Sequence, residues 1–327
     1  MNTLKFVILA LISFETSCIS GSIVAWGRNS YLKFEGVPVS ACATGLLHIA
    51  GLESCDVVSV TSGQGLALCR NGEVHGWLFA TGGIPQPPSD LSEVVSIASG
   101  ALHGLALKRD GTVVEWRIPS TRSQMPQGLT NVIAIAAGFA HSLALRNDGT
   151  LVGWGGTITP AGLTNIVAIA ATPSWDGNNL ALRSDGTVIE WNTRAGRPSI
   201  VTGLSNVTSL VCGIGHQLAL KSDGTVFGWG FNAGGEATGV ATIDQPYRAS
   251  GLVTKNGMVL SNVVSLAASE TYNLALQANG TVVGWGNSGF KLAEVPAGLS
   301  NVVAIAAGGD YCLAVTTNST VIERFRR

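Results

Sequence analysis

The stretch Asn131–Gly155, NVIAIAAGFAHSLALRNDGTLVGWG, recurs along the chain with substitutions. A second copy, EVVSIASGALHGLALKRDGTVVEWR, occupies Glu93–Arg117. Further copies begin near Asp56, Asn165, Asn206, Asn262 and Asn301. A unit of this size cannot bury a hydrophobic core alone, so the copies must stack on one another.

Each copy divides into three short apolar runs, which in the copy at Asn131 are Val132–Gly138, His141–Arg146 and Thr150–Gly155. Runs of about five aliphatic residues bounded by Gly and Asp predict strands rather than helices. An Asp-Gly or Asn-Gly dipeptide between the second and third runs predicts a hairpin turn, because glycine accepts the positive φ that the turn needs. The turn glycines are Gly111, Gly149, Gly186, Gly224 and Gly280. The aspartates of these turns are explained by turn chemistry rather than by acid or base catalysis.

A tryptophan stands near the end of each third run, where a large ring suits packing between neighbouring sheets. These residues are Trp26, Trp77, Trp116, Trp154, Trp191, Trp229 and Trp285. Trp26 belongs to Ser22–Gly27, a third run with no first or second run before it, and the last copy has Arg324 in place of the tryptophan. Seven first runs and seven motif tryptophans therefore predict that the N-terminal strand completes the last unit and closes a ring. The alternative is an open array with frayed ends.

Residues 1–20 differ from the repeats. Lys5 precedes the apolar run Phe6–Phe14, and small and polar residues follow. This pattern is typical of a secretory signal, and the run is too short for a membrane span. We expect residues 1–20 to be a signal peptide and residues 22–327 to form a secreted or cell-envelope domain without a membrane span. An uncleaved anchor and a strand of the core are the alternatives, and lipid attachment at Cys18 is weakly supported because Glu15 replaces an aliphatic residue.

The repeat consensus, AxG-x-x-H-s-L-A-L-x-x-D-G-T-V-x-x-W-G, resembles the regulator-of-chromosome-condensation repeat family. Trp229–Gly239, WGFNAGGEATG, is similar to that family's WGxNxxGQLG signature, with Glu236 at the glutamine position. The resemblance covers residues 22–327 and implies an all-β fold, a seven-bladed β-propeller of antiparallel four-stranded blades. In the family, the eukaryotic founder is a nuclear exchange factor for the small GTPase Ran that binds chromatin. Secreted bacterial members with similar short repeats include a protein inhibitor of β-lactamases.

The net charge of −1 does not indicate the basic surface that binds nucleic acid or an anionic membrane. No catalytic constellation, phosphate-binding loop or CxxC motif is present, so we expect a non-enzymatic protein without cofactor or metal. One repeat position carries His103, His141, His216, Asn178, Tyr272 and Tyr311. We interpret its histidines as structural groups that bond neighbouring backbone, because residues spread around a ring cannot converge on one metal ion. Among the cysteines, Cys42 and Cys55 are the expected disulfide, whereas Cys212 and Cys312 replace small core residues.

The turns before this histidine position differ from copy to copy and should line one face of the ring. The copy at Asn165 inserts Trp175 and Asp176, and Trp175 lies outside the repeat pattern. Aromatic and acidic side chains on a rigid ring suit a partner-binding face, although the tryptophan could also pack on its own blade. The predicted face contains Phe139, Trp175, Asp176, Glu270, Tyr272, Asp310 and Tyr311.

We therefore predict a secreted or envelope-associated, monomeric propeller that binds another protein without catalysis. One alternative is an exchange factor for a small GTPase, which requires that residues 1–20 are not a signal. Another is a propeller enzyme acting on a polysaccharide or a lactone, which requires paired carboxylates or a metal at the central opening. The variable segment Phe231–Ser261 is the second place where a partner could bind.

Overall fold

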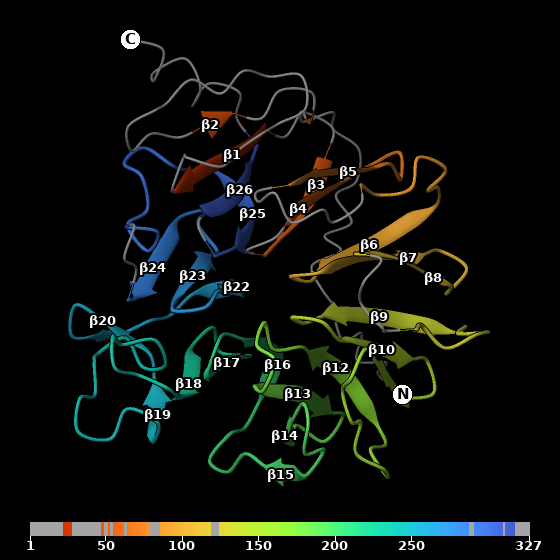
Figure 1. Cartoon of the computed structure of the whole chain (residues 1–327). Helices are drawn as coiled ribbons and strands as arrows, with labels where there is room; N and C mark the ends of the chain where they lie inside the picture. Colours follow the sequence, from red (N-terminus) through yellow and green to blue (C-terminus); the bar gives the residue numbers. More distant parts are fainter. Residues whose placement is uncertain are drawn as a thin grey trace, which may run out of the picture.

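The computed structural model describes residues 22–27, 47–48, 52, 55–61, 64–78, 86–118, 124–287, 291–309 and 311–317. This part of the chain is all-β and consists of small antiparallel sheets (Figure 1). None of its segments is a helix of the length and apolarity that a membrane crossing requires. The predicted signal peptide, Cys42 and Asp310 lie outside the described residues.

Seven of the sheets have three or four strands, and we number them in chain order. Sheet 1 contains β3 (Cys55–Val60), β4 (Gln64–Cys69) and β5 (Val74–Leu78), and sheet 2 contains β6 (Val94–Ser99), β7 (His103–Lys108) and β8 (Val113–Arg117). Sheet 3 contains β9 (Val132–Ala137), β10 (Ser142–Arg146) and β11 (Leu151–Trp154). Sheet 4 contains β12 (Ile166–Ala170), β13 (Asn178–Arg183), β14 (Val188–Asn192) and β15 (Pro198–Ile200).

Sheet 5 contains β16 (Val207–Cys212), β17 (His216–Lys221), β18 (Val226–Gly230) and β19 (Ala249–Leu252). Sheet 6 contains β22 (Val263–Ala268), β23 (Tyr272–Gln277) and β24 (Val282–Gly286). Sheet 7 contains β25 (Val302–Ala307), β26 (Tyr311–Thr316), β1 (Ser22–Gly27) and β2 (Leu47–His48). A two-stranded ribbon, β20 (Thr254–Lys255) and β21 (Met258–Val259), follows β19.

The N-terminal strand β1 is the third strand of sheet 7, as its displaced motif predicted. It pairs with β26 along its whole length, from Ser22 opposite Thr316 to Gly27 opposite Tyr311. Sheet 7 packs on sheet 6 through a cluster that includes Trp26 and Leu274, and on sheet 1 through a cluster that includes Ile23 and Val58. The sheets are arranged around a common centre (Figure 1), so the hydrophobic core lies between neighbouring sheets.

The expectation of four strands in every unit holds for only some of the sheets. In the described part of the chain, sheets 1, 2, 3 and 6 have three strands. In sheet 3 the chain after β11 passes over Gly153 through Thr157 and Thr159, where a Cβ on the glycine would collide with both threonines. The place of the fourth, outermost strand therefore tolerates chain without regular strand pairing, because a strand there adds little to the packing between sheets.

Left-handed residues at two places in most repeats connect neighbouring sheets. The predicted hairpin glycines have positive φ, for example 79° at Gly111 and 78° at Gly149. The residue before most first strands has positive φ as well, 59° at Asn131, which the sequence analysis did not foresee. Val132 of sheet 3 then donates its N–H to the carbonyl of Gly111 in sheet 2 at 3.1 Å. Thr112 donates to the Asp110 carboxylate and lowers the pKa of that group, which agrees with a turn role for the aspartate.

Four buried motif tryptophans donate hydrogen bonds to the preceding sheet, in two ways. Trp154 Nε1 donates to Glu115 Oε1 at 3.1 Å, and Trp229 Nε1 donates to Glu190 Oε2 at 2.9 Å. At Gly228 and Gly284, where glycine replaces this glutamate, the following loop folds back over the glycine and supplies a carbonyl. Trp285 Nε1 donates to Glu236 O at 3.0 Å in this way, and Trp26 Nε1 to Leu292 O at 3.1 Å. A side chain and a loop carbonyl thus satisfy the same buried N–H.

Replacing Glu190 with alanine is expected to destabilise the protein by about 1–3 kcal/mol, because the Trp229 N–H loses its acceptor in a buried position. Glu190→Gln keeps an acceptor oxygen and should lose less. Chemical denaturation followed by circular dichroism measures both values. Glu294→Ala, at an exposed carboxylate, is the control and should stay within about 0.5 kcal/mol of the original chain. Equal losses in Glu190→Ala and Glu294→Ala would contradict the proposed role of the acceptor.

Candidate functional site

We call the repeat position at the start of each second strand the slot, and the turn before it the slot turn. Outside sheet 4, whose slot turn is longer, the residue three positions before the slot donates its backbone N–H to the slot carbonyl and closes the turn. This bond is 2.8 Å long from Gly100 to His103 and from Gly138 to His141. His216 is paired with Gly230 at the end of β18, so the slot turns and the segments that leave the third strands lie at the same end of the sheets.

The slot histidines are buried and each contacts a side chain of the following sheet. The Nε2 atoms of His141 and His216 lie 2.8 Å from Oδ1 of Asn179 and Asn273, respectively. His103 Nε2 lies 2.8 Å from Ser142 Oγ. The structural interpretation agrees with this arrangement. The Nε2 partners are side chains, and His216 also has the kind of backbone hydrogen bond that the sequence predicted, to Ile214. Each histidine has a different partner, so the three do not form a common metal site.

Burial keeps these imidazoles neutral. It lowers the pKa of His103 to about 4, with smaller contributions from His141 and Arg117. It also lowers the pKa values of His141 and His216, although hydrogen bonds to Asn179 and Asn273 oppose the shift. An imidazole that cannot take up a proton near neutral pH serves as a fixed hydrogen-bonding group between sheets.

Two members of the predicted partner-binding face are wrong, because Tyr272 and Tyr311 are each only 1% exposed. The Tyr272 hydroxyl donates to Gly308 O at 2.6 Å, inside the contact between sheets 6 and 7. The slot residue is the first residue of the second strand, and its side chain points between neighbouring sheets. Only the turn before the slot therefore reaches solvent. Glu270 lies half-buried in such a turn.

Phe139 and Trp175 meet at the surface, and with Arg194 they form what we call the aromatic patch. The Phe139 and Trp175 ring centroids are 5.1 Å apart, and the Arg194 guanidinium carbon lies 6.0 Å from the centroid of the Trp175 ring. Trp175 remains 53% exposed, and the neighbouring Asp176 is exposed too. The structure therefore brings together aromatic, cationic and anionic groups that three separate turns supply.

Backbone contacts hold the patch in place. Phe139 N donates to Thr172 O at 3.2 Å, which ties the slot turn of sheet 3 to the slot turn of sheet 4. Asn192, at the end of β14, donates from Nδ2 to Asp176 O at 2.8 Å, and its Oδ1 accepts from Arg194 N at 3.0 Å. One asparagine thus fixes the turn that carries Trp175 and the turn that carries Arg194.

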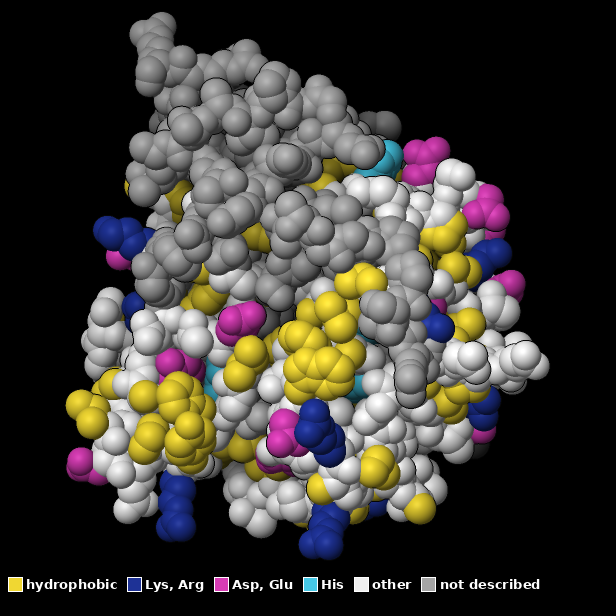
Figure 2. Space-filling model, viewed as in Figure 1, with side chains coloured by type: hydrophobic (Ala, Val, Ile, Leu, Met, Phe, Trp, Pro, Cys, Tyr) yellow, Lys and Arg dark blue, Asp and Glu magenta, His cyan; other side chains and the backbone are white. Residues whose placement is uncertain are grey.

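Sequence reasoning missed Arg194 because it follows a third strand, and only strand pairing shows that such segments lie beside the slot turns. The same arrangement adds a second aromatic pair, Phe231 and Tyr247, with ring centroids 5.0 Å apart. Tyr247 is 74% exposed and belongs to the long segment after β18. Figure 2 shows hydrophobic side chains in separate groups on this face, one near its centre beside charged side chains and one over β18 and β19.

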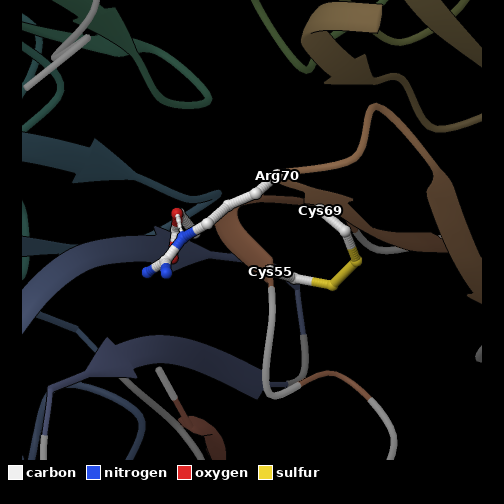
Figure 3. A network of polar contacts seen from close by, with 4 residues as sticks. Cys55, Cys69 and Arg70 are labelled. Atoms are coloured by element: carbon white, nitrogen blue, oxygen red, sulfur yellow. Dashed lines mark hydrogen bonds and ion pairs between the residues drawn. A yellow bond between two sulfur atoms is a disulfide. The ribbon is translucent and has the colours of Figure 1, made fainter. Parts of the chain in front are cut away.

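The expected Cys42–Cys55 disulfide is wrong, because Cys55 is bonded to Cys69 (Figure 3). These two residues face one another in the β3–β4 pairing, a proximity that spacing along the chain does not reveal. Cys212 and Cys312 are buried free thiols, as the sequence analysis predicted for small core residues. Burial raises the pKa of both thiols, so they remain protonated.

Comparisons with known proteins agree with this architecture. The family profile for the Regulator of chromosome condensation (RCC1) repeat matches residues 132–156 and 207–236. Prp20p from Saccharomyces cerevisiae, whose structure was reported with its binding properties to Gsp1p and histones, has a TM-score of 0.70 at 16% identity, with 94% of each chain covered. Human WBSCR16 has a TM-score of 0.67 at 15% identity, with 90% of this chain and 98% of that chain covered.

The ectodomain of the receptor kinase CR4 from Physcomitrella patens is a more distant structural neighbour. Its TM-score is 0.54 at 17% identity, with 78% of this chain and 68% of that chain covered. No curated protein matches the sequence. At these identities the structural matches establish a shared fold and leave the partners of this chain to be inferred from its own surface.

Proposed function

Because this chain is a regulator of chromosome condensation repeat protein, we propose that it is a closed seven-bladed β-propeller that binds another protein and does not catalyse a reaction. Each of the seven sheets would be one blade. Closure is supported by the pairing of β1 with β26 and by the packing of sheet 7 on sheet 1. A closed ring would leave no inner sheet edge free for aggregation.

The observation that carries the binding proposal is the aromatic patch. Tryptophan and arginine are enriched among the residues that dominate binding energy in protein interfaces. Here Trp175 is half exposed although it has Phe139 and Arg194 as neighbours, so a large apolar surface remains available to a partner. Prp20 has been crystallised with Kap60 bound, so a protein of this fold is known to bind another protein.

We place the protein outside the cytosol, in the secreted fraction or the cell envelope. This part of the proposal rests on the basic start and short apolar run of residues 1–20. Mass spectrometry of the mature protein tests it directly. A chain that begins near Gly21 supports secretion, whereas an intact N-terminus on a cytosolic protein would favour the exchange-factor alternative.

Binding is tested in two steps. Residues 22–327 are immobilised, and proteins captured from envelope and culture-fluid fractions of the host are identified and purified. The dissociation constant of the purified partner is then measured for the original chain and for Trp175→Ala. We expect Trp175→Ala to weaken binding at least about tenfold, because a central aromatic contact is worth more than about 1.4 kcal/mol.

Ile200→Ala is the matched control, since Ile200 is a 63% exposed hydrophobic residue on β15 of the same sheet. Its dissociation constant should not change. Equal effects of the two substitutions, or no effect of either, would exclude the aromatic patch as the binding site. A small GTPase as the captured partner, with nucleotide release accelerated by the chain, would replace this proposal with the exchange-factor function.

A further inference from the structure

We propose that reduction of the Cys55–Cys69 disulfide converts Cys55, Cys69 and His75 into a three-ligand site for a soft divalent cation such as Zn²⁺. The sulfur atoms of the two cysteines and a ring nitrogen of His75 all lie within 4.8 Å of one another. Two thiolates and one imidazole are a donor set that zinc prefers. This inference concerns sheet 1 and does not depend on the proposed partner-binding function.

Strand register explains why the three residues converge. Cys55 on β3 is paired with Cys69 on β4, and His75 on β5 is paired with Ala67 on β4. Ala67 and Cys69 are two residues apart, so their side chains lie on the same face of the strand. His75 is therefore the diagonal neighbour of Cys69 on that face, within reach of a long side chain.

The surroundings suit a site that a cation enters from one side. Both cysteines are buried, whereas the His75 side chain is 46% exposed, so the histidine side faces solvent. The Glu73 Oε2 atom lies 3.8 Å from His75 Nε2, so a carboxylate stands beside the ring at ion-pair distance. The Arg70 guanidinium is occupied by Asp56, with 2.9 Å between Nη2 and Oδ1, and the side chain points away from the disulfide (Figure 3).

Formation of the site requires a reductant, for which we name a dithiol. The dithiol transfers two electrons and two protons to the S–S bond and becomes a disulfide itself, while Cys55 and Cys69 become thiols. Cation binding then forms two metal–thiolate bonds and one metal–imidazole bond and releases the two thiol protons. Three protein ligands leave a fourth tetrahedral position for water. In the oxidised chain Cys55 and Cys69 are held in the disulfide and offer no thiolate, so the site exists only after reduction.

The test uses Co²⁺ as a spectroscopic probe on the full chain. The protein is reduced with a dithiol, the dithiol is removed without oxygen, and Co²⁺ is added in steps while sulfur-to-cobalt charge-transfer and tetrahedral d–d absorption are recorded. We expect both bands to saturate at one Co²⁺ per chain, to disappear when Zn²⁺ is added, and to be absent from the oxidised chain.

Two variants assign the ligands, and a third is the control. His75→Ala, at an exposed residue, should keep the fold and weaken Co²⁺ binding at least about tenfold. Cys55→Ser should abolish the charge-transfer band, with circular dichroism confirming that the variant is folded. Cys212→Ala is the control, because Cys212 is a buried free thiol on β16 of sheet 5, and this variant should leave the titration unchanged. The proposal is overturned if the reduced chain shows no band, or if His75→Ala or folded Cys55→Ser titrates like the original chain.

Discussion

The Gly228→Ala variant is expected to lose about 3 kcal/mol of folding free energy, although it adds only one methyl group. A Cβ at this position would lie 1.8 Å from the carbonyl oxygen of Ala237, and that atom belongs to the backbone of the loop that folds back over the glycine. A backbone carbonyl cannot rotate aside as a side chain can. The whole loop would have to move.

Movement of this loop would also disturb sheet 6. The carbonyl of Glu236, next to Ala237, accepts hydrogen bonds from Trp285 Nε1 at 3.0 Å and from Asn273 Nδ2 at 2.8 Å. Both donors are buried, so losing their acceptor is costly. The expected loss therefore combines steric strain within sheet 5 with broken contacts between sheets 5 and 6.

Urea denaturation, followed by tryptophan fluorescence and circular dichroism, measures the effect. Gly251→Ala is the matched control, because Gly251 lies in β19 of the same sheet and no atom approaches its hypothetical Cβ within 4 Å. Its stability should stay within about 0.5 kcal/mol of the original value. Similar losses in the two variants would show that the carbonyl does not press on Gly228.

Acidification from pH 7 to pH 4 is expected to cost about 3 kcal/mol of stability through His103 alone. The pKa of His103 is about 4 in the folded chain and 6.5 in its ordinary state, and burial is the main cause of the difference. Between pH 6.5 and pH 4, His103 is therefore protonated in the unfolded chain and neutral in the folded chain. Stability falls as pH drops below 6.5 and continues to fall down to the folded pKa, at about 1.36 kcal/mol per unit of difference.

Other titratable groups determine how far the total loss of stability between pH 7 and pH 4 deviates from the loss expected from His103 alone. His141 and His216, whose pKa values are also lowered, add losses of the same sign in the same range. Burial raises the pKa of Glu115, and this group opposes the loss because it takes up a proton more readily in the folded chain. The pKa values of the turn aspartates are lowered from 3.8, so their contribution is lost at lower pH than that of His103.

The His103→Gln variant separates the contribution of His103. Glutamine occupies the slot of sheet 1, where Gln64 Nε2 donates to His103 O, so the amide is compatible with the position. Chemical denaturation at several pH values should show a slope between pH 6.5 and 4 that is smaller by up to about one proton than in the original chain. Asp148→Asn serves as the control, since the lowered pKa of Asp148 makes its contribution to the pH dependence of stability fall below pH 4. An unchanged slope in His103→Gln would contradict a buried neutral imidazole.

The sequence alone was sufficient for the first three strands of each repeat and for the hairpin turns between the second and third strands. Alternating apolar runs, the Asp-Gly dipeptides and the repeated tryptophans are local signals, and the structure places Val132–Ala137, Ser142–Arg146 and Gly149 as these signals predict. The pairing of Ser22–Gly27 with the last unit was also predictable, because a lone third run needs a second strand beside it. The strand and turn predictions depend on chemistry within one repeat.

Only the tertiary structure decided which side chains meet. Tyr272 and Tyr311 were predicted at the surface but are buried, because the packing of neighbouring sheets covers the slot. Arg194 reaches Trp175, and Cys69 reaches Cys55, through strand pairing that brings distant positions to one place. A single repeat encodes its own turns and its apolar faces. The contacts between repeats depend on the stacking and register of whole sheets, which no local pattern specifies.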